Sequence, residues 1–232
     1  MKTLILWTPG RVDYQKAWKE QQRLHALRKQ DKIPDVLILL EHPHVYTLGQ
    51  HGDKTNILYQ EVVLKNKGIS VYATDRGGDV TYHGPGQLVG YPLFHYKYLG
   101  FSTRRFVHSL EEVIIQTLKK FSLHAERDPQ YPGVWMDKNK ICSIGLRVIE
   151  GVSMHGFALN VHPDLDFFKG IIACGIKDRG VTSMAKECEK QNLPLPDEKS
   201  LISELTTLFL KIYGFETFQS VSDSTLFSDG IA

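Results

Sequence analysis

The chain has 232 residues, of which 42% are hydrophobic and 23% are charged, and these proportions exclude extensive disorder. The net charge of +2 is too small to predict nucleic-acid binding, and no stripe of Lys and Arg or zinc-finger spacing supports that function. No Ser-, Gly- or Pro-rich linker divides the sequence. We therefore expect one domain over residues 1–218, followed by a Ser-rich, frayed tail over residues 219–232.

The sequence also bears on the compartment of the protein. Residues 1–9 hold an apolar run that is too short for a secretory signal, and no apolar run approaches the roughly 20 residues that span a bilayer. Cys142, Cys174 and Cys188 form no CxxC pair, which argues against a disulfide framework or a cysteine-rich zinc site. We expect a cytoplasmic protein with reduced thiols.

The first half of the chain contains one helical pattern and several strand patterns. Apolar residues recur at helical spacing over residues 13–30, which predicts an amphipathic helix. The short apolar runs 36–40 and 45–48 are typical of buried strands and predict a strand-turn-strand unit. Further strands are predicted at 69–73, 80–82 and 88–93, on either side of a glycine-rich segment.

The second half predicts two more helices and a meander. One amphipathic helix begins near Ser102 or Thr103 as a possible N-cap, and a last helix covers residues 199–213 with Gly214 at its end. Strands separated by polar turns are predicted at 134–136, 141–149 and 152–161. Because strands and helices do not alternate strictly, the expected fold class is α/β in the α+β sense, with a mixed, mostly antiparallel sheet flanked by helices.

Residues 76–87 place glycines and a proline beside Arg, His, Tyr and Thr side chains. Glycine lets main-chain N–H groups approach a ligand closely, and the polar side chains between supply a few fixed hydrogen bonds. The composition favours a binding wall. The alternative is a glycine-rich hairpin that only turns the chain.

Cys174 is a candidate nucleophile. It is followed by Gly175, which leaves the thiol accessible, and then by Lys177 and Arg179, whose charges favour the thiolate. Main-chain N–H groups around Gly175 could face a developing oxyanion. The alternative is a buried apolar cysteine, the role we assign to the other two cysteines.

Lys140 is the candidate partner of Cys174, because it opens a predicted strand at a turn from which its ammonium can reach across the sheet. The alternative is a solvated turn lysine. A unit charge about 4 Å from a thiolate, at an effective dielectric near 20, is worth roughly 4 kcal/mol. One pKa unit corresponds to about 1.4 kcal/mol. Even half of the charge interaction would therefore bring the pKa of a thiol near neutral pH. A neutral lysine would instead act as a general base.

Histidine is a common zinc ligand, and four histidines are candidates, namely His42, His44, His51 and His83. No HExxH motif or paired His and Cys spacing accompanies them. We interpret them as positioning or packing residues, and predict no metal and no cofactor.

Several motifs stand in one order along the chain. They are residues 76–87, 140–145, 155–161 and 174–176, together with 12–14, 39–43, 46–49 and 181–184. With these motifs the chain resembles the octanoyltransferases of lipoate biosynthesis over most of its length. The resemblance implies a fold like the catalytic domain of the biotin and lipoate protein ligases.

The resemblance implies an acyltransferase that moves an octanoyl group from octanoyl-acyl carrier protein to a lysine of a lipoyl domain through a cysteine thioester. The implied acceptors are the lipoyl domains of 2-oxoacid dehydrogenase E2 subunits and the glycine cleavage H protein. By position, Cys174 matches the acyl-accepting cysteine and Lys140 matches its partner lysine. Residues matching the segments that line the acyl site are Arg76, Gly77, Gly78, Asp79, Val80, Thr81, Tyr82, His83, Ser143, Ile144, Gly145, Gly156, Phe157 and Ala158.

Two positions depart from the family pattern. Ala173 stands where proline is usual, and Cys142 with Ser143 replaces an Ala-Ala pair. The second departure places another thiol beside Lys140 in the sequence.

Other functions remain open at this point. The nearest is an ATP-dependent lipoate-protein ligase on the same fold, followed by a cysteine hydrolase and a non-enzymatic acyl-binding module. The chain has no GxxxxGK[ST] motif, which fits a reaction without a nucleotide. Recognition of an acidic carrier protein would use exposed cations such as Arg147, Lys169 and Lys177.

Overall fold

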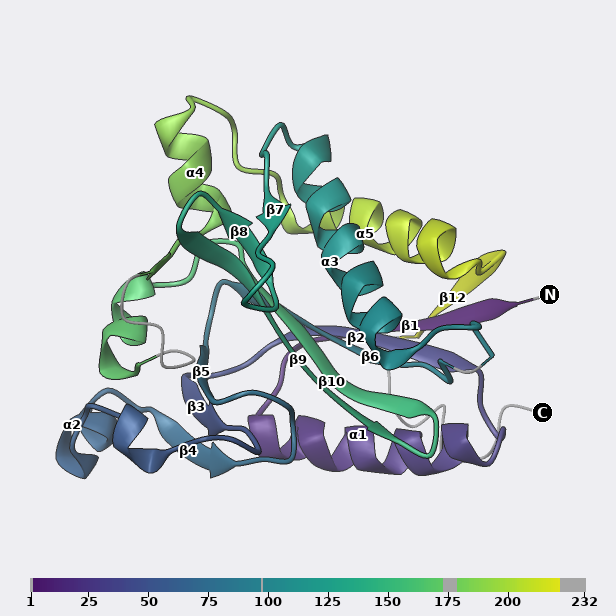
Figure 1. Ribbon diagram of the computed structural model, residues 1–232, viewed down its shortest axis with the longest axis horizontal. Helices are drawn as coiled ribbons and strands as arrows, with labels where there is room; N and C mark the ends of the chain where they lie inside the picture. Colours follow the sequence, from purple (N-terminus) through teal and green to yellow (C-terminus); the bar gives the residue numbers. More distant parts are fainter. Residues whose placement is uncertain (1, 97, 173–178, 222–232) are drawn as a thin grey trace.

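The computed structural model describes residues 2–96, 98–172 and 179–221, and its largest element is one twisted sheet (Figure 1). Within the described residues this sheet has nine strands in the order β12-β1-β2-β6-β10-β9-β8-β7, with β11 beside β9. The pairs β1/β12, β1/β2 and β9/β11 are parallel and the others are antiparallel, which confirms a mixed, mostly antiparallel sheet. The strands are β1 (Thr3–Arg11), β2 (Asp35–Glu41), β6 (Gln87–Leu93), β7 (Glu126–Arg127), β8 (Val134–Met136), β9 (Asn139–Ile149), β10 (Val152–Asn160), β11 (Gly180–Val181) and β12 (Thr217–Val221).

A second, three-stranded sheet lies beside the first, in the order β4-β3-β5. Its strands are β3 (Val45–Leu48), β4 (Ser70–Ala73) and β5 (Val80–His83). The strands predicted at 36–40 and 45–48 are both present and joined by a short turn, but β2 and β3 belong to different sheets. Both edges of β2 are already paired, with β1 and β6, so β3 pairs with β4 and β5 instead.

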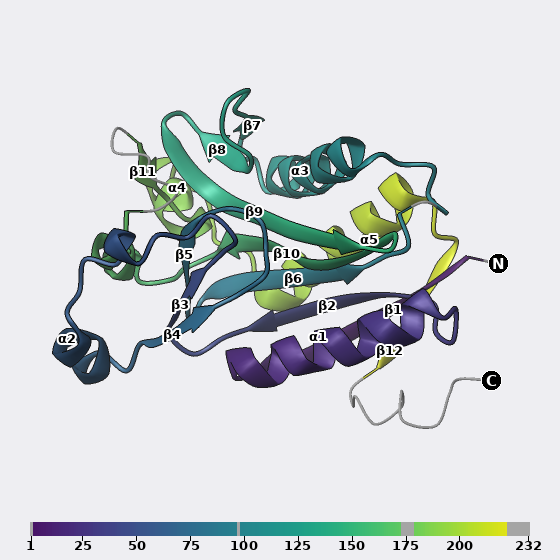
Figure 2. The ribbon, with the colours of Figure 1, turned by 60° about the horizontal axis from the view of Figure 1, so that its bottom comes forward.

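Helices cover both faces of the main sheet. Helices α3 (Thr103–Lys120) and α5 (Glu198–Tyr213) lie on one face and α1 (Tyr14–Lys29) lies on the other (Figure 2). Shorter elements lie at the periphery, namely α2 (Glu61–Asn66), α4 (Met184–Lys190) and the 3-10 turns η1 (Lys54–Asn56) and η2 (Leu165–Gly170). Across the described ranges, every helix is too short or too polar to cross a membrane.

The sheet has apolar side chains on both faces, as β2 illustrates. Leu37 and Leu39 join the core under α3 and α5, whereas Ile38 and Leu40 join the core under α1. Successive side chains of a strand point to opposite faces, so a strand covered on both sides reads as a continuous apolar run. This is why the run at 36–40 predicted a buried strand.

Local signals set the ends of the longer helices as predicted. The Ser102 hydroxyl accepts a hydrogen bond from the main-chain N–H of Arg105 at 3.2 Å, which confirms the predicted N-cap of α3. Gly214 ends α5 with a φ of 68°, in the left-handed conformation that favours glycine. The predicted meander is also confirmed, because β8, β9 and β10 are neighbours in the sheet.

The predicted end of the folded domain is wrong by three residues. Strand β12 continues past Phe218 to Val221 and pairs in parallel with β1. Val221 is 4% exposed and packs in the core under α1, and this burial holds the strand in place. Residues 222–232 lie outside the described part of the chain.

Close packing between β6 and β10 can be tested at Gly90. A Cβ added there would lie 2.2 Å from the buried Phe157 ring. We expect Gly90→Ala to lower the free energy of unfolding by about 1–3 kcal/mol, measured by urea denaturation. Adding Phe157→Leu removes the ring, so the double variant should recover part of that loss. Strictly additive losses would show that the two residues do not collide.

Candidate active site

A cavity of about 420 Å³ lies along β9, where the glycine-rich segment reaches the main sheet. Among the described strands, β8 pairs with β9 only as far as Cys142. Beyond that point the outer edge of β9 receives the main-chain N–H of Gly77, which donates to the carbonyl of Leu146 at 3.0 Å. The cavity is lined by Tyr14, His51, Arg76, Gly77, Gly78, Asp79, Thr81, His83, Val89, Tyr91, Thr103, Val107, Tyr131, Pro132, Lys140, Ser143, Ile144, Gly145, Leu146, His155, Gly156, Phe157 and Ala158.

Most of the residues predicted to bind substrate lie in this wall, and two do not. On β5, Thr81 and His83 line the cavity, whereas Val80 and Tyr82 pack in the core of the small sheet. Side chains alternate along a strand, so neighbouring residues of β5 point in turn to the cavity and to the core of the small sheet. Cys174 lies outside the described residues.

The glycines let two main chains come close together. A Cβ at Gly77 would lie 2.9 Å from the Leu146 carbonyl oxygen, and a Cβ at Gly145 would lie 3.0 Å from the Gly77 carbonyl oxygen. Gly78 has a φ of 89°, which side-chain-bearing residues rarely adopt. The segment is therefore a wall of the cavity rather than a simple hairpin turn.

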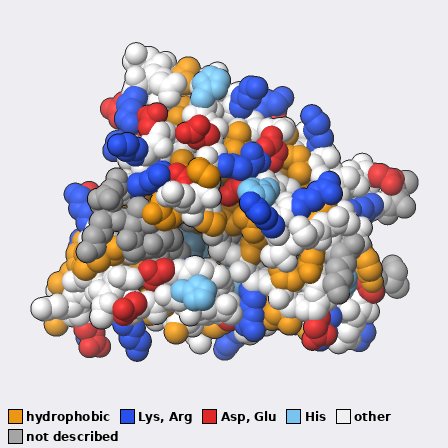
Figure 3. Space-filling model, viewed as in Figure 1, with side chains coloured by type: hydrophobic (Ala, Val, Ile, Leu, Met, Phe, Trp, Pro, Cys, Tyr) orange, Lys and Arg blue, Asp and Glu red, His pale blue; other side chains and the backbone are white. Residues whose placement is uncertain are grey.

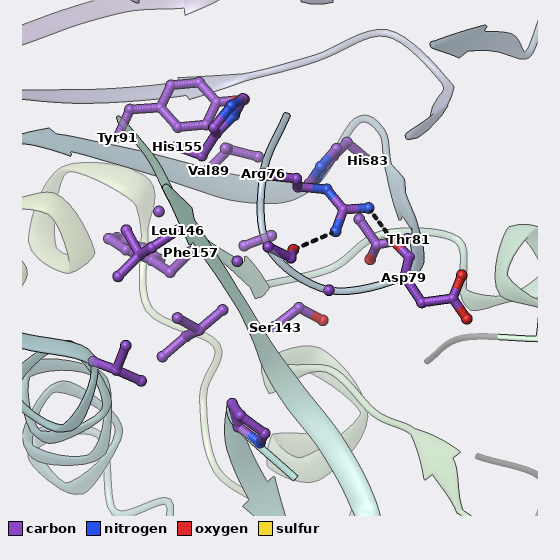
Figure 4. Close-up of a pocket in the computed structure, with 18 of the residues that line it drawn as sticks. Arg76, Asp79, Thr81, His83, Val89, Tyr91, Ser143, Leu146, His155 and Phe157 are labelled. Atoms are coloured by element: carbon purple, nitrogen blue, oxygen red, sulfur yellow. Dashed lines mark hydrogen bonds between the residues drawn. The ribbon is translucent and has the colours of Figure 1, made fainter. Parts of the chain in front are cut away.

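Arg76 fixes the shape of that wall. Its guanidinium donates to the Thr47 hydroxyl at 3.0 Å and to the Thr47 carbonyl at 2.6 Å. It also donates to the carbonyls of Gly77, at 3.0 Å, and of Asp79, at 2.6 Å (Figure 4). A buried cation with several carbonyl acceptors holds the loop in one conformation.

His83 begins a chain of hydrogen bonds that ends at Lys140. Its Nδ1 lies 2.8 Å from the Gln87 side-chain oxygen, and the Gln87 amide donates to Asn160 at 2.9 Å. Asn160 then donates to the Thr182 carbonyl at 2.9 Å, and the Thr182 main-chain N–H donates to the Lys140 carbonyl at 3.0 Å. Burial lowers the pKa of His83 to about 3, so the ring is neutral and its Nδ1–H donates to the glutamine.

His42 and Tyr91 form a second buried pair. The Nδ1 of His42 lies 2.7 Å from the Val12 carbonyl and so carries the proton, while its Nε2 accepts from the Tyr91 hydroxyl at 2.7 Å. Burial lowers the pKa of His42 to about 4. His42 is therefore a packing and positioning residue. No group of three or more metal-ligating side chains occurs among the described residues.

His155 was not predicted as a site residue, although it stands in the motif over 155–161. Its Nε2 lies 2.7 Å from an Asp75 carboxylate oxygen, and that carboxylate also pairs with Arg147. The hydrogen bond from His155 is the main cause that lowers the pKa of Asp75 to about 2, and burial lowers the pKa of His155. The acid is charged and the imidazole is neutral, so Nε2–H donates to Asp75. Arg147 is thus paired with Asp75, which contacts the cavity-lining His155.

Lys140 is buried rather than solvated, with 9% of its surface exposed. Its Nζ donates to the Pro132 carbonyl at 3.2 Å and lies 4.7 Å from the centre of the Trp135 ring. This arrangement excludes the solvated turn lysine. Lys140 also borders a second cavity of about 690 Å³, and the two cavities share Thr81, Lys140 and Ser143.

The second cavity also reaches the described residues that lie nearest to Cys174 in the sequence, one on each side. Ile172 and Arg179 both line it. The Arg179 guanidinium pairs with Asp128 at 2.5 Å and lies 5.0 Å from the centre of the Trp135 ring. In the space-filling view this face of the molecule is hollowed near its middle, and lysine and arginine side chains gather over α3 (Figure 3).

The two cysteines that the structure describes are both buried. Burial raises the pKa of the Cys142 thiol well above its usual value, despite the neighbouring charge of Lys140, and burial also raises the pKa of Cys188. Both thiols are protonated near neutral pH, which suits the structural role predicted for them. Ala173 and Lys177 lie outside the described residues, and Lys169 is exposed and paired with Asp166 at 2.7 Å.

The architecture and the site define the class of protein. The lipoyl protein ligase A/B catalytic domain matches residues 13–205, and the chain belongs to this family.

Within it, the chain is 52% identical to an octanoyltransferase of Alkaliphilus metalliredigens over 75% of this chain and 81% of that protein. It is 44% identical to an octanoyltransferase of Desulforamulus reducens over 89% of this chain and 90% of that protein. The chain belongs with these octanoyltransferases, which are acyltransferases.

Solved structures show the same fold at low identity. Lipoate-protein ligase A bound with ATP has a TM-score of 0.73 at 15% identity, over 96% of this chain and 90% of that chain. A bipartite lipoate protein ligase from Thermoplasma acidophilum, described with its E2 lipoyl domain, has a TM-score of 0.70 at 14% identity, over 96% and 88%. Biotin protein ligase from Leishmania major has a TM-score of 0.54 at 8% identity, over 92% and 76%. The predicted fold is confirmed.

The buried histidines predict how stability depends on pH. An unfolded histidine takes a proton near pH 6.5, whereas folded His42 and His83 do so only near pH 4 and 3. Below pH 6.5 the unfolded state therefore binds more protons, and stability falls as pH falls toward 4. We expect urea denaturation to show a loss of up to about 1.4 kcal/mol per pH unit for each histidine.

Substitution separates this effect from ordinary acid unfolding. His42→Gln should make the decline between pH 6.5 and 4.5 shallower, whereas replacing the exposed His124 by Gln should leave the slope unchanged. Equal slopes for both variants would contradict the assignment to buried rings.

Proposed function

We propose that the chain transfers an octanoyl group from octanoyl-acyl carrier protein to the lysine of a lipoyl domain through a thioester on Cys174. The observation that carries the proposal is the position of Lys140, buried in the wall that the two cavities share. One cavity has a largely apolar wall that suits an acyl chain. The other is bordered by charged side chains and suits the arm of the donor and then the acceptor lysine.

In the first step the Cys174 thiolate attacks the carbonyl carbon of the octanoyl thioester. A carbon–sulfur bond forms to Cys174, and the bond to the pantetheine sulfur of the donor breaks. The charge of the Lys140 ammonium favours the attacking thiolate, and the ammonium then protonates the departing thiolate. The octanoyl-cysteine and a neutral Lys140 amine remain.

In the second step the neutral amine of the acceptor lysine attacks the octanoyl-cysteine. An amide bond forms, the bond to the Cys174 sulfur breaks, and the proton of the attacking amine moves to Lys140. The cycle returns a thiolate and an ammonium and consumes no nucleotide. Support for the proximity of the two residues comes from Ile172 and Arg179, which flank the Cys174 segment and line the second cavity beside Lys140.

The proposed partners follow from this chemistry. The donor is octanoyl-acyl carrier protein, and the acceptors are lipoyl domains of 2-oxoacid dehydrogenase E2 subunits and the glycine cleavage H protein. We place the reaction in the cytoplasm, without a cofactor, a metal, a nucleic acid or a membrane.

Mass spectrometry of Cys174→Ser tests the covalent intermediate. After incubation with octanoyl carrier protein, the wild-type mass should rise by one octanoyl group on Cys174, and added lipoyl domain should remove it. Cys174→Ser should form no adduct and lose transfer, while Cys188→Ser, at a buried thiol, should keep both. Full activity of Cys174→Ser with ATP and free octanoate would instead identify a ligase.

Substitution of Lys140 distinguishes its electrostatic role from its role in proton transfer. Lys140→Arg keeps a cation but does not exchange a proton near neutral pH, so transfer should fall by about 10²–10⁴. Iodoacetamide should still alkylate Cys174 with a pH profile close to that of the wild type, whereas Lys140→Met should shift the profile to higher pH. An unchanged profile in Lys140→Met would contradict thiolate stabilisation.

A further inference from the structure

We propose that Tyr91 sets the longest acyl chain that the enzyme accepts, by closing the inner end of the 420 Å³ cavity. The inference rests on the proposed function, in which this cavity holds the acyl chain. It assigns a specificity role to a residue that no sequence motif singled out.

Burial alone cannot select eight carbons. Each buried methylene contributes about 0.8 kcal/mol, which favours a chain over one that is a methylene shorter by about fourfold. That preference rejects shorter chains but continues to rise for ten or twelve carbons. Discrimination against longer chains therefore needs a rigid obstacle at the end of the cavity.

One row of paired side chains that lines the cavity changes from small to large across three strands. Ser143 and Gly145 on β9 pair with Ala158 and Gly156 on β10, and all four line the cavity. The next strand, β6, contributes Val89 and Tyr91 to the lining, and both belong with Ala158 to the core under α1. This row of paired side chains is thus small on β9 and β10 and large on β6, although larger side chains of β9 and β10 line the cavity elsewhere.

The arrangement of the lining gives the cavity a direction. Ser143, Thr81 and Lys140 are shared with the second cavity, which marks the end where the thioester reacts. In the close-up, Tyr91 and Val89 lie together, away from Ser143 (Figure 4). Tyr91 therefore faces the methyl end of the bound chain.

Tyr91 is held firmly enough to act as a stop. Its hydroxyl donates to His42 at 2.7 Å, and its ring is 6.4 Å from that of His155 in an edge-to-face contact at 83°. Only 3% of Tyr91 is exposed. Moving the ring aside would leave His42 with a buried, unpaired acceptor, which is unfavourable.

The test measures kcat/KM for carrier-protein thioesters of six, eight, ten and twelve carbons. The wild type should decline beyond eight carbons. Tyr91→Ala should raise the ten-carbon rate relative to the eight-carbon rate by more than tenfold, the gain expected for burying two more methylenes. Tyr91→Leu, which leaves less empty volume, should shift the same ratio in the same direction by less, and Tyr91→Phe should keep the wild-type order.

Two further variants separate the possible failures. Ile38, opposite Tyr91 on β2, is buried in the same core but does not line the cavity, so Ile38→Ala should lower stability and keep the order of preference. Ala158→Leu fills the cavity and should shift the optimum toward six carbons. If Ala158→Leu has no effect on the order of chain-length preference, the cavity does not hold the acyl chain, and that part of the proposed function is overturned. If it shifts the order while Tyr91→Ala and Tyr91→Leu do not, only the role of Tyr91 is overturned.

Discussion

The close contact between the glycine-rich segment and the outer edge of β9 is the constraint on which the site depends. At that edge the Leu146 carbonyl accepts from the main-chain N–H of Gly77, and the facing glycines allow an approach that a Cβ would prevent. The buried guanidinium of Arg76 holds the segment in that position through its carbonyl acceptors. Both features hold the glycine-rich segment against β9 in the cavity wall.

Buried polar side chains in and behind the cavity wall are compatible with an apolar ligand. His42 and Tyr91 hydrogen-bond to each other, and His83 uses its Nδ1 on Gln87. Since burial lowers the pKa of both histidines, neither ring carries charge near neutral pH. Hydrogen bonding and neutrality together reduce the cost of burying such groups in and behind a largely apolar wall.

Local patterns predicted much of the fold, and non-local pairing explains what they missed. The N-cap at Ser102 and the left-handed Gly214 depend on neighbouring residues, so the sequence sufficed for both. Strand β12 depends on a partner more than 200 residues away, and its weakly apolar sequence did not reveal it. The motifs located most of the cavity wall, but the burial of Lys140 and the contacts of His155 follow from packing between distant elements.

The fold by itself does not decide the reaction. Ligases of known structure share it at 15% identity or less, including one solved with ATP, so the architecture is compatible with more than one activating chemistry. What favours transfer without a nucleotide is the combination of octanoyltransferase relatives and a buried amine. Among the described residues, Lys140 contacts a carbonyl and an aromatic face, neither of which is an anion. The proposed mechanism uses this amine, which lies in the wall that the two cavities share.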